Sequence, residues 1–121
     1  MDDAIYKEMI LDLYKNPLNK KALLEYDAVQ KEFNPSCGDE IEIFVKFDEN
    51  GKVQDIGHQG VGCAISQAAV SLLTEEIKGK TKQEIQNMTE KDILEMLQIP
   101  ISHTRIKCAT LGLKTLKKCV C

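Results

Sequence analysis

The sequence predicts one α+β domain in which a small antiparallel sheet of about three strands packs against several helices on one face. Three observations predict it: a helical stripe of apolar residues near the N-terminus, alternating apolar residues around position 43, and a run of helical segments after position 64. The chain has 121 residues, 43% of them hydrophobic. A chain of this length buries roughly two thirds of its unfolded surface when it folds, so its fold does not depend on a bound metal for stability.

Two of the predicted strands form a hairpin. Apolar and charged residues alternate over 40–47, which indicates a strand with one buried face. The turn sequence at 48–51 connects it to a second strand over 52–58. Residues 26–33 alternate poorly and are interpreted as the first strand of the sheet. A glycine-rich segment is then expected to interrupt the chain before the next helix.

The helices are predicted from apolar spacing and from end signals. Asp2 and Asp3 suit the start of the first helix, and Pro17 stops it. Capping-box sequences that begin at Thr81 and Thr89 predict two short helices. The predicted helices cover residues 3–16, 64–77, 82–88, 90–99 and 107–118.

Basic residues are concentrated at the C-terminal end. The last seventeen residues contain Arg105, Lys107, Lys114, Lys117 and Lys118 and no acid, whereas the rest of the chain has a balance of −8. This basic helix is interpreted either as a guide for an acidic partner or as a solvated helix face. Nucleic-acid binding is disfavoured, because the segment has no aromatic residue to stack on bases and the whole chain is acidic, with a net charge of −3.

Five cysteines, an odd number, are present in a chain without an apolar run of the ~20 residues that cross a bilayer. The N-terminus also lacks a basic segment followed by an apolar stretch. We therefore expect a cytoplasmic protein with no membrane partner. In that reducing compartment the cysteines are expected to serve as thiolate ligands or nucleophiles instead of forming a disulfide framework.

Three cysteines lie at the boundaries of predicted elements. Cys37 precedes a strand, Cys63 follows the glycine-rich segment at a helix start, and Cys108 begins the last helix. A helix N-terminus lowers the pKa of a thiol, which makes Cys63 and Cys108 candidates for thiolates at neutral pH. Asp39 lies two residues from Cys37 and offers an oxygen ligand to the same centre.

Three thiolates and one carboxylate suit either a tetrahedral Zn²⁺ ion or a [2Fe-2S] cluster, and the spacing does not choose between them. From spacing alone, buried or incidental cysteines are an equal alternative. His58 and His103 are interpreted as solvated histidines, the usual state of a lone histidine in a loop. A hydrolytic cysteine–histidine dyad is disfavoured, because no oxyanion-hole motif or acidic orienter is recognisable. Cys119 and Cys121 are interpreted as a dispensable, frayed tail.

Four motifs identify a resemblance that extends over almost the whole chain. In order they are Leu-Tyr-Lys-Asn-Pro-x-Asn at 13–19, Asn-Pro-Ser-Cys-Gly-Asp at 34–39, Gly-x-Gly-Cys-Ala-Ile-Ser at 60–66 and Arg-x-Lys-Cys-Ala-Thr-Leu at 105–111. Together they resemble the signatures of the IscU / NifU N-terminal / SufU family of iron-sulfur cluster assembly proteins. The resemblance implies a single NifU/IscU-like domain over residues 1–121.

The resemblance also implies a site and partners. Cys37, Asp39, Cys63 and Cys108 would bind the metal centre at one exposed end of the fold, and sulfur would come from a cysteine desulfurase, with Cys108 as the candidate persulfide acceptor. In scaffold members iron and this sulfur become a transient [2Fe-2S] cluster that passes to apo iron-sulfur proteins. In SufU members Zn²⁺ occupies the same ligands and the protein relays sulfur.

Two features of the sequence point to different branches of the family. Lys107 stands where scaffolds carry a histidine, which is similar to SufU, and Arg105 is a second auxiliary basic residue. The 45-position separation of Cys63 and Cys108 is the short one of the scaffolds. We predict a non-enzymatic scaffold for cluster assembly. The first alternative is a zinc-bound, sulfurtransferase-like relay, and the second is a structural zinc interaction module. The resemblance leaves a homo-oligomer open.

Overall fold

The computed structural model describes residues 3–35 and 38–120. Cys37 and Cys121 lie outside the described residues. In chain order the elements are α1 (Asp3–Lys15), β1 (Ala28–Asn34), β2 (Asp39–Phe47), β3 (Val53–Val61), α2 (Ala64–Glu76), α3 (Lys82–Gln86), α4 (Glu90–Leu97), a 3-10 turn η1 (His103–Arg105) and α5 (Ile106–Cys119).

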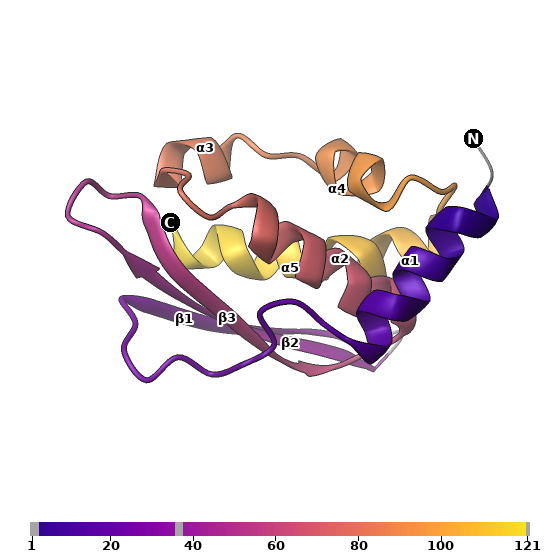
Figure 1. Cartoon of the computed structure of the whole chain (residues 1–121), viewed down its shortest axis with the longest axis horizontal. Helices are drawn as coiled ribbons and strands as arrows, with labels where there is room; N and C mark the ends of the chain where they lie inside the picture. The colour runs from indigo at the N-terminus through magenta and orange to yellow at the C-terminus, as the bar shows by residue number, and fades with distance from the viewer. Residues whose placement is uncertain (1–2, 36–37, 121) are drawn as a thin grey trace.

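The described strands form one antiparallel sheet in the order β1-β2-β3, and the helices lie on one of its faces (Figure 1). Helix α5 contacts β1, β2 and α2, while α1 and α4 both pack against α2. This arrangement confirms the predicted α+β class, including the first strand over 28–34.

The core lies between the sheet and the two central helices. Ile41, Ile43 and Val45 alternate along β2, and each is fully buried in the core cluster that the helices close. From α5, Leu113 and Leu116 are buried in the same cluster. The period of two in the strand and the helical spacing in α5 thus place one face of each element in a shared core.

The glycine-rich segment does not interrupt the sheet, so this prediction was wrong. Strand β3 continues to Val61, and Glu40 of β2 pairs with it. The backbone φ of Gly60 is +133°, and a Cβ atom built there would lie 1.9 Å from the Glu40 carbonyl oxygen. Glycine is therefore required at this position because the two strands approach where a side chain would stand.

His58 is not a solvated loop residue, which corrects a second prediction. It lies in β3 with 1% of its surface exposed, and its Nε2 is 2.8 Å from the Leu18 carbonyl oxygen. The Asn19 carbonyl also accepts a hydrogen bond from the His58 backbone N–H. The imidazole thus fixes the segment after α1 against the sheet. His103, in contrast, is exposed as predicted.

Other departures concern element ends. Helix α4 stops at Leu97, where Gln98 adopts a left-handed φ of +61°, and η1 precedes the last helix. Tyr14 of α1 is half exposed, although its spacing places it on the apolar stripe of the helix. In the described part of the chain, none of the helices has the length and apolar character needed to cross a membrane.

The burial of His58 predicts a pH dependence of folding. Burial lowers the pKa of His58, the Leu18 hydrogen bond opposes this shift, and the charge of Lys20 adds to it. The unfolded chain therefore takes up a proton that the folded chain refuses, so stability falls as the pH decreases below about 6.5, by up to about 1.4 kcal/mol per pH unit.

Urea unfolding between pH 7.5 and 5 measures this effect. His58→Gln should flatten the decrease in the free energy of unfolding, while the exposed control His103→Gln should keep the slope of the parent. Equal slopes in all three proteins would contradict the burial of a neutral imidazole.

Candidate metal centre

Asp39 is the first residue of β2 and is 1% exposed. Its Oδ1 atom accepts a hydrogen bond of 3.1 Å from the backbone N–H of Cys63. The antiparallel register explains this contact, because Glu40 pairs with Val61 and the two chains continue side by side from there. The carboxylate is thus positioned by the sheet and not by a mobile loop.

Cys63 is the N-cap residue of α2, as the sequence predicted for a cysteine at a helix start. Its side chain is partly exposed, and its carbonyl accepts hydrogen bonds from Gln67 N at 3.1 Å and Ser66 Oγ at 3.2 Å. A Cβ atom on Gly62 would lie 2.2 Å from Ser66 Oγ and 2.7 Å from Asp39 Oδ1. The absence of a side chain at Gly62 therefore lets the carboxylate reach the helix start.

Cys108 lies in the first turn of α5 and is fully buried. The Asn34 Nδ2 atom donates a hydrogen bond of 3.7 Å to its sulfur atom, across 74 positions of sequence. Asn34 ends β1 and is itself buried, with Asp39 as its partner in β2. Hydrogen bonds to sulfur favour the thiolate over the thiol.

The three described candidates converge on one point. Donor atoms of Asp39, Cys63 and Cys108 all lie within 4.8 Å of one another. The fourth predicted ligand, Cys37, lies outside the described residues. Donors that stand roughly 2.0–2.3 Å from one ion are at most about 4.6 Å apart, so a small contraction of this group would let all three bind a single metal ion.

The chemistry of the donors fits a metal. Asp39 Oδ2 is buried and has no hydrogen-bond partner among the described residues. An unsatisfied carboxylate oxygen is costly in a protein interior, and a cation would compensate for it. One carboxylate and two sulfur atoms suit Zn²⁺ or the iron of a cluster, and neither belongs to the hard, all-oxygen environment of Mg²⁺.

Arg105 supplies a positive charge beside both thiols. Its interactions with Cys63, first, and with Cys108 raise the pKa of the guanidinium, which thus stays charged. From the sequence, Lys107 and Arg105 were expected only as auxiliary basic residues of the site. Lys107 is exposed, and within the described chain it makes no ion pair with Asp39.

The tail cysteine Cys119 is separate from this group. It is buried near the end of α5, eleven residues or about 16 Å of helix beyond Cys108, and its sulfur donates to the Ile43 carbonyl at 3.7 Å. Burial raises the pKa of Cys119 to about 11, so the thiol is neutral at physiological pH. It is a core residue and not the frayed end that the sequence suggested.

The contact between Gly62 and Asp39 can be tested by substitution. Gly62→Ala should displace the carboxylate and weaken Zn²⁺ binding by roughly 10- to 100-fold, the usual effect of disturbing the surroundings of a ligand. The double variant Gly62→Ala with Ser66→Ala removes one clash but keeps that with Asp39, so it should regain stability without regaining affinity. Chelator competition measures the affinity and urea unfolding the stability. Affinity equal to the parent in the single variant would refute this account of Gly62.

The sequence has relatives of known name. The model of the family described as NifU-like N terminal domain matches residues 5–121. The zinc-dependent sulfurtransferase SufU of Bacillus subtilis (strain 168) is 36% identical, over 96% of this chain and 89% of that protein. The iron-sulfur cluster assembly scaffold protein IscU of Aquifex aeolicus (strain VF5) is 38% identical, over 92% of this chain and 71% of that protein.

A solved structure agrees with these relatives. The structure of a protein described as a putative iron-sulfur cluster assembly scaffold protein for the SUF system, from Fervidobacterium islandicum AW-1, has a TM-score of 0.81 and 31% identity, and the match covers 100% of both chains. The fold, the motifs and the family match lead to one conclusion. This chain belongs to the family of NifU-like N-terminal domains.

Proposed function

We propose that residues 1–121 act as one NifU N-terminal-like domain that assembles a transient [2Fe-2S] cluster and passes it to apo iron-sulfur proteins. The observation that carries the proposal is the convergence of Asp39, Cys63 and Cys108 within 4.8 Å, with a carboxylate oxygen that lacks a partner among the described residues. We place this work in the cytoplasm, where thiols stay reduced.

The proposed ligands are Cys37, Asp39, Cys63 and Cys108. A carboxylate is a harder donor than a thiolate and therefore binds iron-sulfur centres less tightly. A scaffold has to release its product, so one exchangeable oxygen ligand among three thiolates suits assembly followed by transfer. A resident structural metal would be better held by thiolates and imidazoles alone.

Sulfur enters, in this proposal, from a persulfide on a cysteine desulfurase. The Cys108 thiolate attacks the terminal sulfur, the bond between the two donor sulfurs breaks, and the donor cysteine leaves as a thiolate. No net oxidation occurs in this step, and an external reductant supplies the two electrons that convert the sulfur to sulfide. Asn34 and Arg105 both interact with Cys108 and favour its thiolate. Because Cys108 is fully buried, the donor reaches it only after a local movement.

A zinc-bound sulfur relay is the second candidate function. Lys107 in place of the scaffold histidine favours it, as does the similarity to a protein named as a zinc-dependent sulfurtransferase. In this alternative Zn²⁺ would be held by the same residues and would keep the thiols deprotonated when bound. A purely structural zinc module is the weaker alternative, because such sites lack an exchangeable carboxylate in their usual ligand sets.

Anaerobic reconstitution separates the two candidates. After removal of bound metal by a chelator, ferrous iron, cysteine, a desulfurase and dithiothreitol should give iron and sulfide in equal amounts, with visible absorption from thiolate-to-iron charge transfer. Cys63→Ala should lose this absorption because a ligand is removed. The control Cys119→Ala with Cys121→Ala should retain it, because Cys119 lies at the far end of α5.

A different outcome would reverse the order of the candidates. A colourless protein that rebinds one Zn²⁺ per chain, fails to form the cluster and still accepts persulfide sulfur would establish the relay in place of the scaffold. Zinc in an aerobically purified sample does not decide the matter, since thiolate sites generally prefer Zn²⁺ to ferrous iron.

A further inference from the structure

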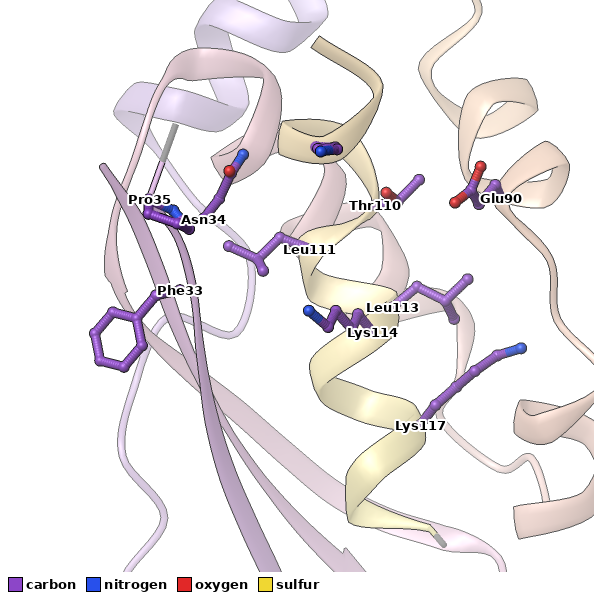
Figure 2. Close-up of a pocket in the computed structure, with 10 residues that line it drawn as sticks. Phe33, Asn34, Pro35, Glu90, Thr110, Leu111, Leu113, Lys114 and Lys117 are labelled. Carbon is purple, nitrogen blue, oxygen red and sulfur yellow. The ribbon is translucent and has the colours of Figure 1, made fainter. Parts of the chain in front are cut away.

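A groove of about 510 Å³ lies beside the metal centre, between the end of β1, the outer side of α5 and the first residue of α4 (Figure 2). We name it the α5 groove. Its walls include Asn34, Pro35, Leu111, Lys114, Lys117 and Glu90. In Figure 2 Leu111 points toward the end of β1, while Glu90 faces α5 from the opposite side. The groove therefore runs along α5, and a polypeptide segment of a partner could lie in it parallel to the helix.

The groove carries a net positive charge, because three lysines and one acid, Glu90, line it. Lys107, Lys114 and Lys117 line it, and none of them lies within 4.0 Å of a carboxylate of the described residues. Their neighbour Lys118, outside the groove, pairs with Glu32. The Lys118 hydrogen bond lowers the pKa of the Glu32 carboxyl, and the charge of Lys114 also helps to lower it. The rest of the chain is acidic, with a balance of −8 over residues 1–104. A negatively charged partner is thus attracted to this face more than to the rest of the chain, whose net charge is negative.

The groove is continuous with the proposed sulfur-accepting site. Asn34 lines the groove and also donates the hydrogen bond to Cys108. Lys107, the residue before Cys108, is part of the wall. A ligand at this end of the groove would contact Asn34, which holds the Cys108 sulfur. Cys108 itself is fully buried. Docking here and access to Cys108 are therefore coupled through Asn34.

The walls suit a polypeptide better than a nucleic acid. The one aromatic residue of the groove, Phe33, has its ring directed away from α5, so it offers no platform on which a base inside the groove can stack (Figure 2). Leu111 and Leu113 lie behind the wall and are each only 4% exposed, so the accessible surface of the groove is mainly that of its lysines. Acidic side chains of a polypeptide match a row of lysines along one helix.

We propose that the α5 groove receives an acidic segment of the cysteine desulfurase, which docks there while it delivers sulfur to Cys108. The inference rests on the proposed function and adds the surface and the chemistry of the partner. The desulfurase is favoured over a recipient protein because the groove ends at the predicted acceptor of sulfur.

Charge reversal inside and outside the groove tests the docking. The double variant Lys114→Glu with Lys117→Glu is compared with Lys52→Glu with Lys82→Glu, an equal change of charge on exposed residues outside the groove. The dissociation constant for the desulfurase of the same organism is measured at several NaCl concentrations, and persulfide on Cys108 is followed by mass spectrometry. Inorganic polysulfide serves as a donor that needs no docking, and zinc content verifies the site.

The groove variant should bind the desulfurase roughly tenfold more weakly at low salt and lose most of the salt dependence of the parent. Persulfide from the desulfurase should form more slowly, while persulfide from polysulfide and zinc content stay unchanged. The control variant should behave as the parent does.

Three outcomes would overturn the inference. Unchanged desulfurase binding in the groove variant would reject the groove while leaving the proposed function intact. Normal desulfurase binding with impaired cluster transfer to an apo-ferredoxin would assign the groove to a recipient. A parent protein that neither binds the desulfurase nor accepts its sulfur would reject the proposed function itself.

Discussion

The hydrogen bond from the Cys63 backbone to the Asp39 carboxylate ties the start of α2 to the start of β2, and the geometry of the metal centre depends on it. The bond exists because β2 and β3 pair up to Glu40 and Val61, so the chain segments beyond the pair lie together. Helix α5 then brings Cys108 to the same point by packing on β1 and β2. Three donors on regular elements need little rearrangement to meet a metal, which is how a binding site gains precision.

The same arrangement explains how the site combines binding with release. The carboxylate has one oxygen engaged with backbone and one without a partner in the described chain, so it can hold a cation and also let it go at moderate cost. Arg105 keeps a positive charge beside Cys63 and Cys108 that does not depend on a metal. Arg105 thus offsets part of the negative charge that deprotonated Cys63 and Cys108 side chains would bring to the site.

The sequence anticipated the elements whose signals are local and missed the features that depend on distant partners. The alternating residues of β2 and the capping boxes of α3 and α4 were sufficient for their prediction. The convergence on Asp39 came from the family motifs, since the spacing of the cysteines alone left incidental residues as an equal alternative. The burial of His58 depends on the Leu18 carbonyl forty positions away, and Gly60 is explained only by the Glu40 carbonyl across the sheet. No periodic pattern and no local motif in the sequence signals either contact.

The central claim is that Asp39 completes a centre of three thiolates. Zinc X-ray absorption spectroscopy of the protein loaded with one Zn²⁺ per chain tests it most directly, because it counts the sulfur and oxygen neighbours of the metal. We predict three sulfur atoms at about 2.3 Å and one oxygen at about 2.0 Å, with the oxygen lost or replaced in Asp39→Ala. Two or fewer sulfur neighbours in the parent, or an unchanged spectrum in Asp39→Ala, would contradict the account.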